Sequence, residues 1–250
     1  MTRRSALLAI AAVLSGWFLP NEPNAARADF VLFDAALNTN PDQQGWLYAT
    51  NPGSIATRAT SGGVTVLDTT GRSADQAGFF STGHPLVGTL DRTAGFTVTF
   101  RLQLERETHA TNDRAGFSVI VLGSDSKGLE LSFWNNEVWA QNDSPLFTHG
   151  EGAAFNTTAA LTDYALKIQG NSYTLTANGL SLLSGLVRDY SAFGAPYTSK
   201  SFLFFGDDTS SAAARTDIAR VTLGAVPEPA SWALFAAGSL GLTLTARKRR

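Results

Sequence analysis

Two glutamates beside one predicted turn are the residues of this chain best placed for acid–base chemistry. Glu130 and Glu137 flank an Asn-Asn dipeptide, and glycoside hydrolysis normally uses two carboxyl groups roughly 5 to 9 Å apart. The residues that share a strand face with Glu130 are Ser132 and Trp134, so that face offers no second carboxylate. A solvent-facing glutamate on a half-exposed sheet explains Glu130 more simply. We therefore predict no catalytic residue and no enzyme, and keep a glycan hydrolase or lyase as the alternative.

Aromatic and amide side chains gather around the same turn and form a candidate ligand-binding group. Its members are Trp134, Asn136, Trp139, Asn142 and Asp143. Aromatic faces stack on sugar rings, while amides and carboxylates form hydrogen bonds with hydroxyl groups. The general tendency of tryptophan to be buried favours the alternative, in which both indoles pack in the interior.

Acidic turn residues are the candidate ligands for a metal ion. Asp207 and Asp208 follow an apolar run, and Asp125 lies in another turn. Calcium binds several oxygen ligands, but neither segment has the spacing of a dedicated calcium loop, and turn aspartates usually bond their own backbone. Calcium bound by these three residues stays a hypothesis. The chain has no cysteine, which excludes a thiolate zinc site and disulfide bonds.

The elements that must position these side chains are predicted strands. Apolar and polar residues alternate from Phe96 to Leu104, which indicates a strand with one buried face. Gly170-Asn171 and Asn178-Gly179 lie between alternating runs and predict tight hairpin turns. Further strands are predicted at 116–122, 129–134, 137–141, 164–168, 173–177, 180–183, 202–205 and 218–223, with shorter ones at 30–37, 46–49, 64–68 and 77–80.

A dozen or so short strands without a convincing soluble helix predict an all-β fold, an antiparallel β-sandwich or barrel, over residues 29–223. The runs GFTVTFRLQL, RAGFSVIVL, LELSFWNNEVWA, TDYALKIQGNSYTLTANG and KSFLFFGDD follow one another in the order seen in concanavalin A-like or laminin-G-like jelly rolls. The chain resembles that superfamily over residues 94–223. The resemblance implies a lectin-like jelly-roll sandwich, in which calcium often binds at the rim. Glycosidases of this kind commonly carry Glu-x-Asp-x-Glu on one strand, and here only Glu130 matches.

The C-terminal residues have three parts with different physical properties. Pro227, Glu228 and Pro229 form an extended segment, because proline restricts the backbone and removes amide donors. An uncharged run at 230–246 follows, roughly 25 Å long as a helix and so slightly short of a bilayer core of roughly 30 Å. Four cations at 247–250 hold that end in the cytoplasm. We predict a linker with the triplet at 224–229, a transmembrane helix at 230–246 and a basic tail.

This tail resembles the PEP-CTERM tail of exported proteins in Gram-negative, polysaccharide-secreting bacteria. The resemblance implies recognition and processing of the Pro-Glu-Pro triplet by a membrane-embedded exosortase, after transient insertion into the inner membrane.

The N-terminus predicts export independently. Arg3 and Arg4 precede an apolar run at 6–19, and Ala26 and Ala28 occupy the two positions that a signal peptidase reads. Residues 1–28 are therefore predicted to be a signal peptide with a short apolar helix, cut after Ala28.

The segment between the two ends is acidic. Of 19 basic residues seven lie in the predicted signal and tail, and of 21 acidic residues only two do. The remaining 12 basic and 19 acidic residues leave a net charge of about −7, which disfavours nucleic acid as a partner. We therefore predict an exported protein, anchored in the inner membrane as a precursor and then located at the cell surface or in a biofilm matrix. Its sandwich is predicted to bind extracellular polysaccharide, the alternative being a structural matrix protein without a specific ligand.

Overall fold

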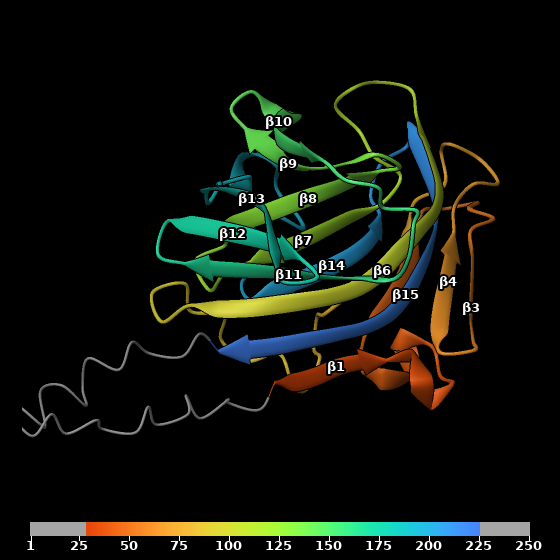
Figure 1. Cartoon of the computed structure of the whole chain (residues 1–250), viewed down its shortest axis with the longest axis horizontal. Coiled ribbons are helices and arrows are strands. Elements are labelled where there is room, and N and C mark those ends of the chain that lie inside the picture. Colours follow the sequence, from red (N-terminus) through yellow and green to blue (C-terminus); the bar gives the residue numbers. More distant parts are fainter. Residues whose placement is uncertain (1–28, 226–250) are drawn as a thin grey trace, which may run out of the picture.

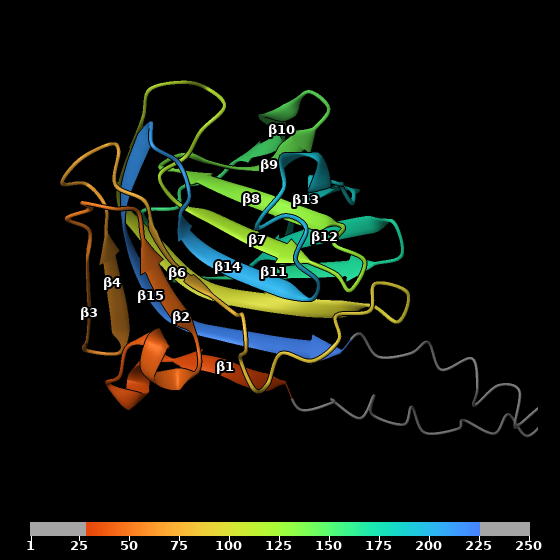
Figure 2. The same ribbon diagram turned by 180° about the vertical axis from the view of Figure 1, so that it is seen from behind.

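A computed structural model describes residues 29–225. The predicted signal peptide with its cleavage residues Ala26 and Ala28, the Pro-Glu-Pro triplet and the predicted transmembrane helix lie outside the described residues. Residues 29–225 form two antiparallel β-sheets packed face to face, as the two views of Figures 1 and 2 show. The all-β prediction is confirmed.

The first sheet contains eight strands. In spatial order these are β13 (Leu180–Leu186), β12 (Ser172–Ala177), β11 (Thr162–Gln169), β6 (Phe96–His109), β15 (Ala212–Ala225), β4 (Val64–Asp68) and β3 (Thr57–Ser61), with β1 (Phe30–Asp34) paired to β15.

The second sheet contains seven strands. Their order is β10 (Leu146–Ala154), β9 (Glu137–Asp143), β8 (Gly128–Trp134), β7 (Ser118–Leu122), β14 (Phe202–Asp207), β5 (Ala77–Phe80) and β2 (Leu47–Thr50). The helices of the described residues are short 3-10 turns, η1 (Ala35–Leu37), η2 (Pro41–Gln44) and η3 (Ser191–Phe193).

The main core lies between the sheets and follows the alternation of the sequence. On β6 the side chains of Phe96, Val98, Phe100, Leu102 and Leu104 are at most 4% exposed, as the period-two pattern predicts. Burying each such side chain stabilises the fold by about 1.5–3 kcal/mol. Sheet pairing is thus set by which residues must face the interior.

A second apolar cluster covers the outer face of the second sheet. It contains Ile120, Leu122, Tyr190, Tyr197, Phe202 and Phe204, and Phe80, Leu146 and Phe147 pack against it. Tyr190 and Tyr197 come from residues 187–201, here called the covering segment. Because this segment lies over them, β7 and β14 are buried on both faces, which explains their continuous apolar sequences.

The two ends of the described chain lie side by side. Phe30 of β1 pairs with Leu223 of β15, and both ends leave the same corner of the molecule (Figure 1). Each strand of residues 29–225 finds its partners within that range, so this segment is expected to fold independently. Among the described residues no helix has the length and apolar character to span a bilayer.

Candidate functional site

The covering segment is fixed to the second sheet at its first residues. Gly128 donates its backbone amide to the Arg188 carbonyl at 2.9 Å, and Arg188 donates back to Gly128 at 2.8 Å. The Arg188 guanidinium forms an ion pair with Glu151 on β10, to which Tyr173 also donates a hydrogen bond. Further along, the Tyr190 hydroxyl donates to the Gln141 carbonyl at 2.7 Å. These contacts hold the segment in place.

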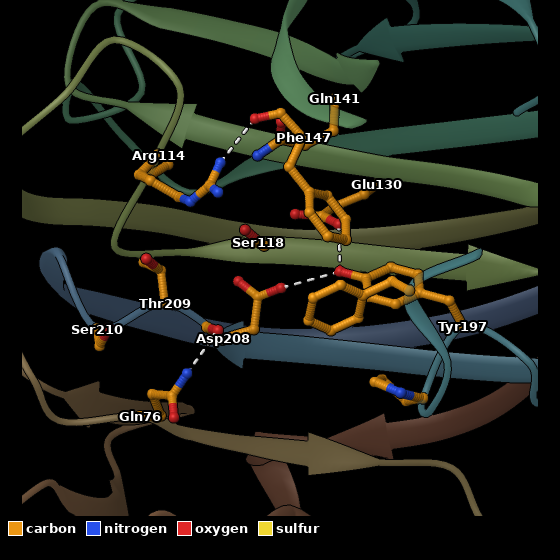
Figure 3. Close-up of a pocket in the computed structure, with 13 residues that line it drawn as sticks. Gln76, Arg114, Ser118, Glu130, Gln141, Phe147, Tyr197, Asp208, Thr209 and Ser210 are labelled. Atoms are coloured by element: carbon orange, nitrogen blue, oxygen red, sulfur yellow. Dashed lines mark hydrogen bonds between the residues drawn. The ribbon is translucent and has the colours of Figure 1, made fainter. Parts of the chain in front are cut away.

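A cavity of about 240 Å³ remains between the covering segment and the outer face of the sheet. Its polar walls come from β8, β9 and the loops after β6 and β14, and its aromatic wall comes from the covering segment and β10 (Figure 3). The lining residues are Gln76, Arg114, Ala115, Ser118, Glu130, Gln141, Phe147, Phe193, Pro196, Tyr197, Asp208, Thr209 and Ser210. We call it the Glu130 cavity.

Two carboxyl groups in this cavity meet at one hydroxyl. The Tyr197 hydroxyl oxygen lies 2.5 Å from Glu130 Oε2 and 3.3 Å from Asp208 Oδ2, and Figure 3 shows both carboxyls pointing toward it. A tyrosine hydroxyl has one proton to donate. If it donates to Asp208, the contact with Glu130 is a hydrogen bond only when Glu130 carries a proton. The three groups are therefore best satisfied when the two carboxyls hold one proton between them.

Electrostatics places that proton on Glu130. Burial raises the pKa of Glu130 well above its usual value, and the neighbouring charge of Asp208 raises it further. Burial also raises the pKa of Asp208. The Arg114 guanidinium acts in the opposite direction on both carboxyl groups and lowers the pKa of each. Neutral Glu130 beside ionised Asp208 and cationic Arg114 leaves the cavity close to electrically neutral.

Gln141 acts on Glu130 in the same direction as Arg114. It lies on β9 and is 2% exposed, and its amide offsets a small part of the rise in the pKa of Glu130 that burial causes. Its Nε2 donates to the Asp113 carbonyl at 3.3 Å, whereas its buried Oε1 accepts no hydrogen bond from the described residues. A buried acceptor without a donor costs about 1–3 kcal/mol. The hydroxyl of a ligand would satisfy it.

Aromatic rings form the mouth of the cavity. Phe193 is 58% exposed, and its ring lies edge-on to Phe147 with the centroids 4.9 Å apart. The Phe147 carbonyl accepts a hydrogen bond from Arg114 at 2.6 Å, so the guanidinium is held next to the aromatic mouth. Polar groups inside and an exposed ring at the entrance are suited to a ligand with both hydroxyls and an apolar face.

The expectation that Glu130 faces solvent is wrong, and so is the expectation that only Glu137 offers it a partner. Glu130 is 2% exposed because the covering segment lies over its side of the sheet. The Glu137 carboxylate instead contacts His149, with 3.1 Å between Oε1 and Nε2. The second carboxyl near Glu130 comes from Asp208. The earlier reason for expecting no enzyme, a missing second carboxylate, therefore no longer holds.

The predicted tryptophan and amide group does not line the Glu130 cavity. Trp139 is fully buried and stacks on His149 with ring centroids 4.1 Å apart. Trp134 is half-buried and donates its indole N–H to the Arg114 carbonyl at 2.8 Å.

The other three members lie at or near the surface. Asn136 is exposed, Asn142 donates to the Thr148 hydroxyl at 3.3 Å, and Asp143 accepts the Asp189 amide at 2.8 Å. Ligand binding by this group stays a prediction.

Each of the three candidate calcium ligands has protein partners or a site of its own. Asp125 forms an ion pair with Arg92, Asp207 accepts the Thr69 hydroxyl at 2.6 Å, and Asp208 belongs to the Glu130 cavity. Within residues 29–225 no group of three or more histidine or acidic side chains is arranged to hold a metal ion.

The sequence did not single out Tyr197, Arg114 or Gln141. Tyr197 and Arg114 lie in irregular segments without periodicity, and Gln141 reads as an ordinary polar position of a strand. Asp208 carried a signal, since an acidic pair after the apolar run FLFF is unusual. The sequence did not indicate that the Glu130 carboxyl lies opposite Asp208.

Comparison with known families identifies the tail. Residues 225–250 match the PEP-CTERM protein-sorting motif. The tail is a PEP-CTERM sorting motif. It indicates an exported protein that is processed at the membrane by exosortase. Comparison with curated proteins gives no sequence match.

Solved structures share the fold of residues 29–225. The carbohydrate esterase vb_24B_21 of the Shiga toxin-encoding bacteriophage phi24B is similar with 13% identity and a TM-score of 0.56, covering 79% of this chain and 99% of that chain. A Bacillus subtilis protein with a galectin-like fold has 10% identity and a TM-score of 0.49, with coverages of 78% and 96%. The exoplasmic domain of VIP36 has 11% identity and a TM-score of 0.46, with coverages of 78% and 88%. The likeness to the esterase, with its TM-score above 0.5, shows a shared sandwich fold and nothing further.

Proposed function

We propose that the exported sandwich binds extracellular polysaccharide, with one sugar unit seated in the Glu130 cavity and stacked on Phe193. The observation that carries this proposal is an exposed aromatic ring at the mouth of a cavity lined by acceptors and donors. A sugar ring has apolar C–H faces and a rim of hydroxyls, so it satisfies both kinds of surface at once. The sandwich fold and the sorting motif are in keeping with a protein that works among extracellular glycans.

The polar lining can pair with the hydroxyls of a neutral sugar. Asp208 accepts hydrogen bonds, Arg114 donates them, and Gln141 offers an acceptor that the described residues leave unpaired. The proton shared by Glu130 and Asp208 leaves one negative charge, which Arg114 balances. A neutral saccharide therefore enters without burying an uncompensated charge.

The test compares two exposed phenylalanines. Phe193→Ala removes the ring at the cavity mouth, and Phe30→Ala removes a ring on β1 of the other sheet that is 54% exposed. In glycan-array and polysaccharide pull-down assays on residues 29–225, we expect Phe193→Ala to weaken binding about tenfold, equivalent to about 1.4 kcal/mol. Phe30→Ala should bind as the unmodified segment does. Absence of any retention by the unmodified segment, with and without calcium, would refute the proposal.

The Glu130–Asp208 pair favours glycan hydrolysis as a second candidate function. Both carboxyl oxygens are in reach of one hydroxyl, so they lie within roughly 6 Å of each other, close to the roughly 5–5.5 Å of retaining glycosidases. Protonated Glu130 would give its proton to the leaving oxygen while Asp208 forms a bond to the anomeric carbon. Water would then cleave that bond and return a proton to Glu130.

This candidate is tested by measuring new reducing ends after incubation with polysaccharide. Glu130→Gln should abolish turnover and leave binding nearly unchanged, because glutamine keeps the shape of neutral glutamic acid. Glu137→Gln is the matched control and should have no effect. Unchanged turnover in Glu130→Gln would remove Glu130 from the chemistry, and binding without any turnover by the unmodified protein would remove the candidate altogether.

The final location and the partners complete the proposal. Signal peptidase would act on the N-terminus and exosortase on the sorting motif, after a transient stay in the inner membrane. The processed sandwich would then reside at the cell surface or in the matrix of a biofilm, in contact with the polysaccharide that it binds.

A further inference from the structure

An apolar pocket lies directly beside the Glu130 cavity. It has a volume of about 220 Å³ and opens on the same outer face of the second sheet, over β2, β5, β7 and β14. Gln76, Pro196 and Asp208 line both spaces. The two are therefore neighbouring compartments with a common wall, and a single ligand can extend from one into the other.

The apolar pocket has a floor of packed rings. Phe204 is 2% exposed and Ile120 is 1% exposed, and the half-buried Phe80 lies against Phe204 with ring centroids 4.9 Å apart. Gly78 makes this packing possible, since a Cβ at that position would lie 2.2 Å from a Phe204 ring carbon. The Phe204 ring can lie over β5 only because Gly78 has no side chain.

The contrast between the compartments restricts the chemistry of the ligand. The Glu130 cavity suits hydroxyl groups, whereas the surface of the other pocket is mainly apolar and includes Ala49, Gly78, Phe80, Ile120 and Phe204. An apolar cavity of roughly 150 Å³ is large enough for benzene, so the pocket accommodates a group of several carbon atoms. The shared wall carries the Asp208 carboxyl, whereas Arg114, which balances its charge, lines the Glu130 cavity and not the apolar pocket. An anionic substituent in the apolar pocket is therefore disfavoured.

The geometry points to an acylated saccharide as the ligand, with its sugar ring in the Glu130 cavity and an uncharged O-acyl group in the apolar pocket. This inference rests on the proposed function, because it assumes that the Glu130 cavity takes a sugar ring. An ester fits where a carboxylate does not, since it has no charge. Its alkyl part gains free energy by leaving water, at about 0.8 kcal/mol for each CH₂ group.

The first test compares one polysaccharide with and without its esters. Exopolysaccharide from the producing cells is immobilised in its native form, after mild alkaline saponification, and after chemical re-acetylation or re-butyrylation. We expect saponification to weaken binding of residues 29–225 about fourfold for a single lost methyl contact. Re-acetylation should restore the affinity, and butyryl esters should exceed it. Equal affinity for all four forms would overturn the inference.

The second test places a ring in the apolar pocket. Ala49 is an exposed residue of β2 that lines this pocket but not the Glu130 cavity, so Ala49→Phe fills the space without disturbing the core. The variant should bind native and saponified polysaccharide equally, at the affinity that the unmodified segment has for the saponified form. Ala59→Phe, at an exposed position of β3 in the other sheet, should keep the preference for esters.

The outcomes separate the two proposals. Binding of the saponified polymer together with indifference to esters contradicts the acyl pocket and leaves the saccharide site standing. Failure of the unmodified segment to bind any of the four forms of the polysaccharide contradicts the saccharide site itself. An ester preference that survives in Ala49→Phe would place the acyl group elsewhere on the surface and overturn the inference.

Discussion

Asp207 is a buried acid whose ionisation should control how stability depends on pH. Burial raises its pKa to about 9, while the same group in the unfolded chain titrates near 3.8. Its two oxygens contact the Thr69 hydroxyl and the Thr209 amide. Thr69 Oγ1 also lies 3.2 Å from the Ala214 carbonyl oxygen. When neutral Asp207 donates its proton to Thr69 Oγ1, the Thr69 hydroxyl can donate to this carbonyl.

The sign of the effect follows from proton binding. Between about pH 4 and pH 9 the folded state holds a proton on Asp207 that the unfolded state has released. The free energy of unfolding therefore falls as the pH rises through this range, by at most about 1.4 kcal/mol per pH unit.

Asp207→Asn tests this account because asparagine cannot ionise and can donate to Thr69. We expect the variant to unfold at about the same urea concentration as the unmodified segment near pH 4 and at a clearly higher one at pH 8. The measurement is urea denaturation of residues 29–225 at several pH values. Parallel pH profiles for the two proteins would contradict the assignment.

At the residue scale, the sequence indicated the types of side chain that form the site more reliably than their positions in the fold. Glu130 was singled out, but its partner Asp208 comes from the end of another strand, and pairing between distant segments is not visible in local spacing. Trp139 was grouped with polar neighbours along the chain, yet its ring is fully buried, because His149 stacks on it and covers it on the outer face of the sheet.

At the scale of elements, the covering segment is the part on which the cavity depends. Its attachment through Arg188 and Glu151 lies away from the cavity lining. Removing the guanidinium leaves Glu151 part-buried without its cation, which costs more than losing an exposed ion pair. We expect the segment to detach more often and Tyr197 to leave its carboxyl partners more often.

Arg188→Leu is the variant for this expectation, and Arg220→Leu, at an exposed position of β15, is its control. We expect polysaccharide affinity to fall about tenfold in Arg188→Leu. Amide hydrogen exchange at residues 187–201 should become faster, while β6 and β11 remain protected. Unchanged exchange in this segment would show that the ion pair does not hold it.

Strands with an alternating or a continuously apolar sequence could be predicted, and those with neither pattern could not. β6 and β11 were predicted because each second residue is apolar. β10 was missed because its sequence LFTHGEGAA is half-buried nearly throughout and has no alternation. β3 was missed because TRATS lies at the sheet edge with no fully buried side chain. The predicted strand at 30–37 ends at Asp34, whose side chain caps η1 by accepting the Ala36 amide.

For the molecule as a whole, the sorting motif gives a direct prediction. Replacing Pro227, Glu228 and Pro229 by alanine removes the triplet that exosortase is expected to bind. Unprocessed precursor should then accumulate in the inner membrane, measured by immunoblotting of membrane and extracellular fractions. A control with alanine at Arg220, in the folded sheet, should mature normally. Normal maturation of the triplet variant would refute the sorting role of these residues.

The arrangement also separates the candidate site from the point of attachment. Thr209 and Ser210 line the Glu130 cavity just before β15 begins, and the sorting motif follows the far end of that strand. A strand of this length spans roughly 40 Å. Thr209 and Ser210 therefore lie at the opposite end of β15 from the sorting motif.

The pairing of β15 with β1, β4 and β6 has a consequence for the order of events during secretion. Among the described strands β15 is synthesised last, and it lies between β6 and β4 inside the first sheet. These two strands therefore cannot be joined into one sheet until nearly the whole domain has been exported. Contacts between residues so far apart in sequence form late and slowly. We therefore expect the domain to complete its fold only after nearly all of it has been exported.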